Sequence, residues 1–403
     1  MIKRKQIVQL SLFFLLLHPF YLYILNTFKI YQMPLTIIAI LLLVLLTKLK
    51  IHKKLITLIL PWVIFFVYMA LNNIGKINDL LFYFIMIIIM LLLSMNNGWQ
   101  KEVIKLITIM LLPHVLFTLI FFFVPNLYVR VRPIIAARNI MFEGYRTALT
   151  GHYSTNAIYI SISVLIFGSV FFQKKMKEIE KKYVFLFLIS IIAILLTTKR
   201  GPLIFSLASV FITYILVDKK RFSNRFIKVL FSLMILFVMF YLVANYIPAL
   251  AGAFARFSED GDSGRSVMYL LAIKMFLMNP LMGRGTGAYK IQYYYYLAKD
   301  ADHMYLNTHN VYLQLLAENG IIGLVMFLFA AILTLIISIK LLQEFHIKNN
   351  SNECVMYISV AFQVYFLLYC LTGNPLYDSM MYMPYFIFCA ISYSFYMRRN
   401  YER

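Results

Sequence analysis

Long apolar runs, separated by short connectors that carry many of the lysines and arginines, restrict the fold of this chain more than any other feature. A helix needs about 20 apolar residues to cross the hydrocarbon core of a bilayer, and many of the runs approach that length. The chain is 62% hydrophobic and only 13% charged, whereas soluble domains are about one quarter charged. A soluble fold could not bury so much apolar surface, and a transmembrane barrel would show short alternating segments. We therefore predict an all-α polytopic membrane protein.

The runs predict about twelve transmembrane helices in a single integral membrane domain over residues 1–403. The first span follows the basic residues 1–5 and has no small-residue cleavage site, so we interpret it as an anchor and not as a removed signal. The later spans are expected at residues 34–48, 54–71, 80–95, 103–124, 153–172, 183–198, 202–217, 227–247, 320–341, 354–371 and 380–397.

Charge predicts the orientation of these helices. Placing the N-terminus in the cytoplasm puts the basic connectors 48–54, 174–182 and 218–228 inside, as the positive-inside rule requires. An even number of spans then leaves both termini in the cytoplasm. The formal net charge of +22 could indicate nucleic-acid binding, but the cations lie in connectors where membrane topology explains them. We therefore expect membrane lipids as partners, and no nucleic acid.

Two long loops lie on the outer side in this orientation. The loop at residues 248–319, inserted before the tenth span, is the longest polar interval of the chain, and we expect it to contain short amphipathic helices and most of an active site. The loop at residues 125–152 carries charges that we interpret as solvated, with ligand contact as the alternative. These are Arg130, Arg132, Arg138, Glu143 and Arg146.

Cations occupy two predicted helix starts. Lys199 and Arg200 precede a Gly-Pro pair, and because Pro favours the first helical position, Arg200 should lie where free N–H groups attract anions. This pair suits a phosphate, and contact with lipid headgroups is an equally good reading. Arg265 lies in the first turn of a predicted short helix. Its guanidinium could fork two hydrogen bonds to a diphosphate, and a plain surface arginine is the alternative.

A glycine-rich segment at residues 283–287 places Arg284 between glycines. Such a segment could form an anion-binding nest of backbone N–H groups. It matches no P-loop and follows no predicted strand, so a flexible turn is the favoured reading.

His309 and Asn310 begin a predicted helical stretch, with Tyr312 on the same face as the histidine. A histidine is a good general base near neutral pH. Glu318, nine residues on, should face the opposite side of a regular helix, so we interpret it as an anchor of the helix end.

Cysteines and carboxylates show no metal-ligand spacing, so we expect neither a metal nor a cofactor. The three cysteines are interpreted as packing residues. They are Cys354, Cys370 and Cys389.

Five short motifs, in order between residues 197 and 323, resemble the O-antigen ligase and polymerase superfamily. They are Thr198-Lys199-Arg200-Gly201, Ser263-Gly264-Arg265, Pro280-Leu281-Met282-Gly283-Arg284-Gly285, His309-Asn310-x-Tyr312-Leu313-Gln314 and Glu318-Asn319-Gly320-Ile321-Ile322-Gly323. The resemblance implies a glycosyltransferase in the bacterial cytoplasmic membrane that uses neither metal nor nucleotide. Its donor would be an undecaprenyl-diphosphate-linked oligosaccharide at the outer face, and its acceptor a glycan hydroxyl.

The resemblance also implies roles for single residues. Arg200 and Arg265 would hold the diphosphate, and His309 would activate the acceptor hydroxyl. Lys199 and Arg284 depart from the family pattern, and we place them as further diphosphate contacts. Supporting roles are expected for the three polar residues of the following helix. These are Asn310, Tyr312 and Glu318.

Two activities within this superfamily fit the sequence. We favour a polymerase that joins repeat units of a capsular polysaccharide, an exopolysaccharide or an O-antigen, aided by a chain-length regulator or flippase of the same pathway. The alternative is a ligase that moves finished glycan to lipid A core, a wall polymer or a protein. A transporter is a remoter alternative, because few ionisable residues lie within the predicted spans.

Overall fold

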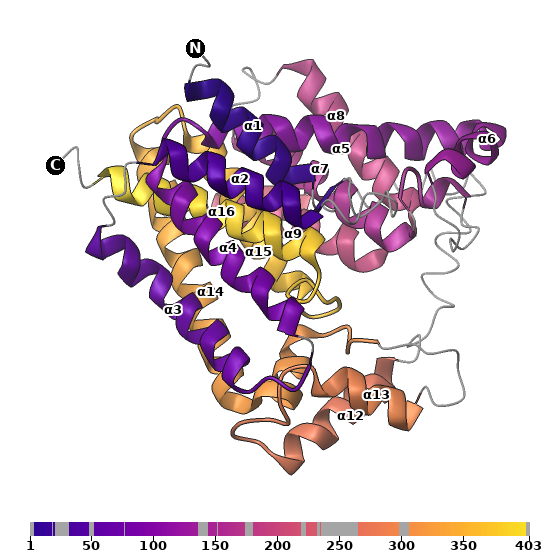
Figure 1. Cartoon of the computed structure of the whole chain (residues 1–403). Coiled ribbons are helices and arrows are strands. Elements are labelled where there is room, and N and C mark those ends of the chain that lie inside the picture. Colours follow the sequence, from indigo (N-terminus) through magenta and orange to yellow (C-terminus); the bar gives the residue numbers. More distant parts are fainter. Residues whose placement is uncertain are drawn as a thin grey trace. The chain divides into compact units, whose positions relative to one another are not determined.

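The computed structural model describes most of the helical chain (Figure 1). The described residues are 4–17, 19–20, 32–47, 52–75, 77–135, 144–150, 152–173, 180–218, 223–231, 234, 265–297 and 306–399. Several predicted features lie outside them. These are most of the span at 227–247, the side chain of Arg132, Arg138, Glu143, and residues 248–264 and 298–305 of the second loop.

Regular structure among the described residues is helical, and a single isolated bridge joins Asn73 to Thr286. The longer helices are α1 (Arg4–Leu17), α2 (Gln32–Leu46), α3 (Lys53–Leu71), α4 (Ile77–Met95), α5 (Gln100–Phe123), α6 (Pro125–Ile135), α7 (Tyr153–Gln173), α8 (Lys181–Leu196), α9 (Arg200–Val217), α12 (Arg265–Met278), α13 (Ala288–Leu297), α14 (Val311–Ile347), α15 (Glu353–Tyr369) and α16 (Ser379–Arg399). A short 3-10 helix, η3, covers Gly144–Arg146.

Five of the described helices are long and apolar enough to cross a membrane, namely α3, α5, α7, α9 and α14. Shorter apolar helices lie at Gln6–Leu17, Met33–Leu46, Leu80–Met95 and Glu353–Tyr369. The prediction of a helical membrane protein is therefore confirmed. The number of twelve spans and the outer position of residues 248–319 stay predictions.

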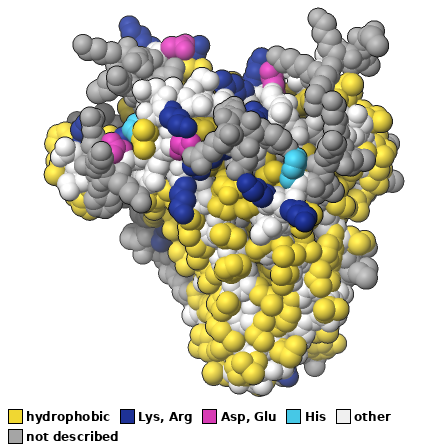
Figure 2. Space-filling model, turned by 90° about the vertical axis from the view of Figure 1, so that its left-hand side faces the viewer, with side chains coloured by type: hydrophobic (Ala, Val, Ile, Leu, Met, Phe, Trp, Pro, Cys, Tyr) yellow, Lys and Arg dark blue, Asp and Glu magenta, His cyan; other side chains and the backbone are white. Residues whose placement is uncertain are grey.

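Exposed apolar side chains on α14 follow helical spacing. They are Ile321, Val325, Phe329, Ile332 and Ile336. Residues three or four apart lie on one face of a helix, so this face is an apolar stripe of the kind that contacts lipid tails. Figure 2 shows hydrophobic side chains over much of the face drawn, with most of its charged side chains gathered in one part.

Contacts within the chain divide it into two compact units. Unit one contains residues 1–46, 98–261 and 339–365, and unit two contains residues 47–97, 262–338 and 366–403. In unit one, α7 is the central helix. Residues 155–169 are all buried, and α5, α8 and α9 pack against α7. A helix that is buried on every side can be apolar all round, as α7 largely is.

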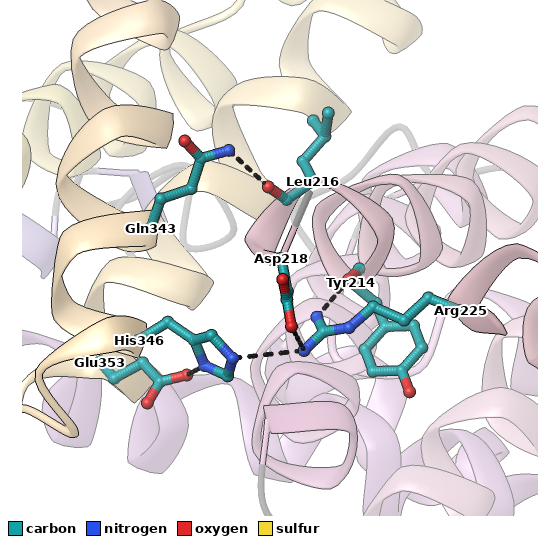
Figure 3. A network of polar contacts seen from close by, with 7 residues as sticks. All are labelled: Tyr214, Leu216, Asp218, Arg225, Gln343, His346 and Glu353. Atoms are coloured by element: carbon teal, nitrogen blue, oxygen red, sulfur yellow. Dashed lines mark hydrogen bonds and ion pairs between the residues drawn. The ribbon is translucent and has the colours of Figure 1, made fainter. Parts of the chain in front are cut away.

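A polar network in unit one joins the ends of several helices (Figure 3). Arg225 donates to the carbonyl oxygen of Tyr214 at 2.6 Å and lies 3.9 Å from the carboxylate of Asp218. Its guanidinium also lies 3.4 Å from Nε2 of His346, whose Nδ1 is 2.7 Å from Glu353. The network ties α9 and the helical residues 223–231 to the end of α14 and the start of α15.

The core of unit two surrounds Trp62 of α3. Its ring contacts Phe327 of α14 and Tyr385 and Phe386 of α16, with ring centroids 6.2, 5.8 and 5.1 Å away. The indole Nε1 donates to the Thr334 hydroxyl at 3.1 Å, so the buried polar group is satisfied. These contacts hold the part of α14 that follows its kink at Gly320.

Candidate active-site residues

The turn between α8 and α9, in unit one, places the first cationic pair. Thr198 has a φ of +60°, and the amides of Thr197 and Thr198 donate to the carbonyls of Ile194 and Leu195 at 3.1 and 3.0 Å. The chain therefore reverses sharply within three residues. Arg200 is the first residue of α9, at the end of the helix where N–H groups face away from the helix body.

Arg146, which the sequence does not single out from the other loop arginines, contacts this turn. Its Nη2 donates to the Thr198 hydroxyl, and its Nε lies 3.5 Å from the Thr197 carbonyl oxygen. The guanidinium carbon lies 4.5 Å from the centre of the Tyr153 ring, and Nζ of Lys199 lies 4.0 Å from the same centre. The interpretation of Arg146 as a solvated charge is wrong, because its side chain is held by the turn and by an aromatic ring.

Buried polar side chains hold the backbone beside Arg146. The amide of Asn156 donates to the Arg146 carbonyl oxygen and to the Thr118 hydroxyl, each at 2.9 Å. The hydroxyls of Tyr128 and Thr147 lie 3.1 Å apart. Through these bonds the segment after η3 is attached to α5, α6 and α7, so Arg146 occupies a fixed position.

The surroundings of this turn are electropositive. Partial desolvation lowers the pKa of His152, and the positive charges of Lys199 and Arg146 lower it further. Among the described residues, no carboxylate forms an ion pair with Arg146 or Lys199. An anion at this turn would therefore meet uncompensated positive charge.

In unit two, His309 lies immediately before α14 and outside it. Its φ is +55°, and α14 begins at Val311 after Asn310, whose Oδ1 accepts from the Leu313 amide at 3.0 Å. The sequence prediction that a helix begins at His309 is therefore wrong by two residues. Asn310 is the cap, and the expected shared face of His309 and Tyr312 does not form because the histidine is not helical.

Two side chains from other segments contact His309. The Asn374 side-chain amide lies 3.2 Å from Nδ1 of the histidine ring. The hydroxyl of Tyr269 on α12 lies 3.5 Å from the His309 carbonyl oxygen. Asn374 lies in the connector between α15 and α16, outside the motifs that the sequence singles out. Its position after a predicted outer span end is a signal that could have identified it.

Arg265 is the first residue of α12, and Asp262 to Gly264 lie outside the described residues. Arg265 is one turn from Tyr269, so both lie on one face of α12, the face that reaches His309. Arg265 and Asp378 both interact electrostatically with the hydroxyl of Tyr369. Arg265 and His309 thus occupy neighbouring segments of unit two.

Asp378 is a further acidic group of this neighbourhood. Burial raises its pKa to about 6, and the Met380 amide donates to its carboxylate at 3.1 Å. It lies directly before α16, at the end of the connector that also carries Asn374.

The side chains of Tyr312 and Glu318 form hydrogen bonds with other groups of the protein. The Tyr312 hydroxyl donates to the Leu367 carbonyl oxygen at 2.7 Å. Glu318 is fully buried, and its Oε1 accepts from the Tyr289 amide and from the Gln314 side chain, each at 3.2 Å. These contacts agree with the interpretation of Glu318 as an anchor.

The glycine-rich segment forms a packed joint in unit two. The amides of Arg284 and Gly285 donate to the carbonyls of Ala317 and Glu318 at 3.0 and 2.8 Å, and the Thr286 amide donates to the Asn72 carbonyl at 2.7 Å. These N–H groups are engaged by protein oxygens, so the segment is neither an anion nest nor a flexible turn. The Arg284 side chain is exposed, with Nη1 lying 3.4 Å from the Met278 sulfur.

The described residues contain no group of three His, Cys, Asp or Glu side chains that could hold a metal ion. The cysteines are free thiols, and Cys370 and Cys389 are buried.

Residues 185–328 match the family model described as O-antigen ligase. This stretch of the chain is similar to the O-antigen ligase family. Members of this family are membrane glycosyltransferase-like enzymes. No curated protein matches the sequence at a significant level. The O-antigen ligase segment contains Arg200, Arg265 and His309, whereas Arg146 and Asn374 lie outside it.

The O-antigen ligase segment extends over both units. Arg200 belongs to unit one, and Arg265 and His309 belong to unit two. The meeting of all three side chains over one substrate stays a prediction.

Proposed function

We propose that the protein transfers a glycan from an undecaprenyl-diphosphate-linked oligosaccharide to an acceptor sugar hydroxyl at the outer face of a bacterial cytoplasmic membrane. The preferred reaction is the joining of repeat units into a capsular polysaccharide, an exopolysaccharide or an O-antigen. The match of residues 185–328 to the O-antigen ligase family is the observation that carries the proposal. Cations at the first residues of α9 and α12, and a histidine held by neighbouring segments, support it.

The chemistry needs two kinds of group. The acceptor oxygen attacks the anomeric carbon, the bond from that carbon to the diphosphate oxygen breaks, and the diphosphate leaves with the electron pair. Negative charge grows on the leaving oxygens, and the guanidinium groups of Arg200 and Arg265 would stabilise it. The acceptor proton passes to His309, and attack from the face opposite the leaving group inverts the anomeric centre.

His309 can act as the base through Nε2 only if Nδ1 carries the hydrogen. That tautomer is favoured when Asn374 presents its carbonyl oxygen to Nδ1. Asn374 Oδ1 is buried and accepts no hydrogen bond from the described residues, while Nδ2 lies at the histidine. The oxygen and nitrogen of an amide exchange places by a flip of the group, which would give Oδ1 the Nδ1–H donor.

Ligase-type transfer is the second candidate, because the matching family model is described as O-antigen ligase. In that case the acceptor is lipid A core, a wall polymer or a protein, and the lipid-linked donor carries a finished glycan. The donor side of the reaction is the same for both candidates.

The test is turnover of a defined undecaprenyl-diphosphate oligosaccharide by the purified full-length protein in lipid nanodiscs. Mass spectrometry should show products longer by whole repeat units for a polymerase, and transfer only to an added acceptor for a ligase. His309→Ala should abolish product while the donor stays intact. Arg265→Lys should lower turnover by about tenfold or more, because lysine cannot fork to a diphosphate. Full turnover by the His309 variant would remove the proposed base.

A further inference from the structure

The short helix α12, in unit two, is apolar on two opposite faces. On one face Ala272 and Met275 are buried in a cluster with Tyr289 of α13 and Ala317 of α14. The other face carries five apolar side chains that are each between 41% and 69% exposed. They are Val267, Leu270, Ile273, Leu277 and Met278. At about 100° per residue these five fall within an arc of about 140°, so they form one continuous face.

The exposed apolar surface continues beyond the end of α12. Leu281 and Met282 are 63% and 52% exposed. We call these two side chains and the five of α12 the α12 surface. Soluble monomers rarely expose a contiguous apolar patch of this kind, and a helix that is apolar all round is typical of burial in protein or in a membrane. The α12 surface therefore requires an apolar partner.

Backbone hydrogen bonds join the α12 surface to the lipid-facing stripe of α14. The amides of Ile321 and Ile322 donate to the carbonyl oxygens of Pro280 and Leu281 at 2.9 and 3.3 Å. The stripe begins at Ile321, directly after the kink of α14 at Gly320, and α14 is long and apolar enough to cross a membrane. The α12 surface thus adjoins the point at which the lipid-facing part of α14 begins.

The length of α12 excludes a second crossing of the membrane at this place. The helix has 14 residues, so at about 1.5 Å per residue it is about 21 Å long, and the hydrocarbon core is about 30 Å thick. A short helix with an outward apolar face, joined to the start of a span, fits the boundary between headgroups and acyl chains.

The charges of this segment favour phospholipid over protein as the partner. Residues 265–297 contain four cationic residues and neither Asp nor Glu. Lys274 and Arg284 are exposed, and long cationic side chains can keep their charged ends at headgroup level while their stems lie against apolar groups. Anionic headgroups attract such cations, whereas a second copy of the chain docked through the same surface would bring like charges together.

We propose that the α12 surface is a membrane-contact surface, with its apolar side chains among the acyl chains of one leaflet and Lys274 and Arg284 at the level of anionic headgroups. In the predicted orientation this is the outer leaflet. The assignment does not depend on the proposed reaction, because it rests on exposure, backbone bonding and charge. Its consequence is that α12, whose Tyr269 contacts the His309 carbonyl oxygen, is held at the membrane surface.

The test places spin labels on the full-length protein in nanodiscs that contain phosphatidylglycerol, in a variant whose three native cysteines are replaced by alanine. Leu270→Cys and Leu277→Cys put a label on the α12 surface. Phe329→Cys, in the middle of the α14 stripe, is the lipid reference, and Lys348→Cys, in the exposed turn after α14, is the water reference. Power saturation measures how accessible each label is to oxygen, which dissolves in hydrocarbon, and to a nickel complex that stays in water.

The ratio of oxygen to nickel accessibility at Leu270→Cys and Leu277→Cys should be severalfold higher than at Lys348→Cys and close to that at Phe329→Cys. A ratio like that of Lys348→Cys would show that the surface meets water. Low accessibility to both reagents would show that protein covers it, as in a dimer. Either result would overturn the proposal.

Thermal melting of each labelled variant controls for folding, and if one of the two α12 variants fails to fold, the other one decides. The proposed function fails separately from this surface. Wild-type protein that does not turn over the defined donor, together with labels on α12 that contact lipid, would keep the membrane-contact surface and remove the transferase.

Discussion

At the scale of single residues, the side chains that surround His309 and the α8–α9 turn come from positions far apart in the chain. Asn374 is sixty-five residues from His309, and Arg146 is fifty-two residues from Thr198. Neither pairing follows from helical or strand spacing, because both depend on how remote helices pack. Sequence motifs singled out His309 and the arginines at the two helix starts, and the side chains that contact His309 and the α8–α9 turn became visible only in the fold.

The contact at Nδ1 predicts that Asn374 acts by positioning His309. Asn374→Leu should lower kcat by about a hundredfold with little change in KM, because the ring loses the partner that fixes its tautomer. Asn374→Asp should retain more activity, and its negative charge should raise the pKa of the base and move the acidic limb of the pH–rate profile upward. Turnover of the defined donor between pH 5 and 9 checks both, and an unchanged profile in the Asp variant would argue for a purely structural role.

Asp378 predicts a pH dependence of stability. Its pKa is raised from the ordinary value of 3.8 to about 6, so between these values the folded protein binds the proton more tightly than the unfolded chain does. Its stabilising contribution is present below pH 4 and is lost as the pH rises to 6. Asp378→Asn keeps the acceptor for the Met380 amide but removes the titration.

Melting temperatures at pH 4.5, 5.5, 6.5 and 7.5 test this prediction. Wild-type protein should lose stability relative to Asp378→Asn as the pH rises. Parallel curves for the two proteins would show that Asp378 does not titrate in this range.

At the scale of elements, the glycine-rich joint shows why backbone conformation is hard to read from a sequence. Gly283 has a φ of +70°, and a Cβ built there would lie 2.3 Å from the Glu318 carbonyl carbon. Gly320 has a φ of +64°, and its kink lets the Ile321 amide donate to the Pro280 carbonyl oxygen at 2.9 Å. The motifs predicted the helix end near Glu318, whereas the reading of residues 283–287 as a flexible turn is wrong, because these two segments are hydrogen-bonded to each other. Their mutual bonding follows from packing, which motif spacing does not encode.

Gly283→Ala should therefore destabilise the protein by about 3 kcal/mol or more, because the new methyl group meets backbone that cannot move aside. Gly98→Ala is the matched control. Gly98 also has a positive φ, +79°, but a Cβ there meets nothing within 4 Å, so only about 1 kcal/mol of backbone strain is expected. Thermal melting in detergent measures the stability of both variants, and size-exclusion chromatography checks that they are folded. Equal losses of stability in the two variants would contradict the packing explanation.

At the scale of the whole molecule, the apolar runs were sufficient to predict a helical membrane protein, and five described helices meet the criteria for crossing a bilayer. The hydropathy pattern shows how long and how apolar each run of residues is, so it also predicts where most of the helices lie. It does not predict that the chain divides into two units built from interleaved segments, because that division depends on which helices contact one another.

The predicted orientation can be tested with two cysteine substitutions in a variant whose three native cysteines are replaced by alanine. Arg284→Cys should react with a membrane-impermeant maleimide in intact cells, because its loop is predicted to be outside. Lys228→Cys should react only after the membrane is permeabilised. Both positions are exposed in the fold. The opposite pattern of labelling would invert the topology and put the candidate site in the cytoplasm.

The glycine-rich joint also has a consequence for how the protein is made. Its three strips of backbone, at residues 72–75, 283–287 and 317–322, leave the ribosome at widely separated times. The joint cannot close until the last of them has been synthesised, so a nascent chain halted near residue 300 carries the earlier two strips without their partner. Assembly of this joint therefore follows the synthesis of residues 317–322 and cannot be completed by the first three quarters of the chain alone.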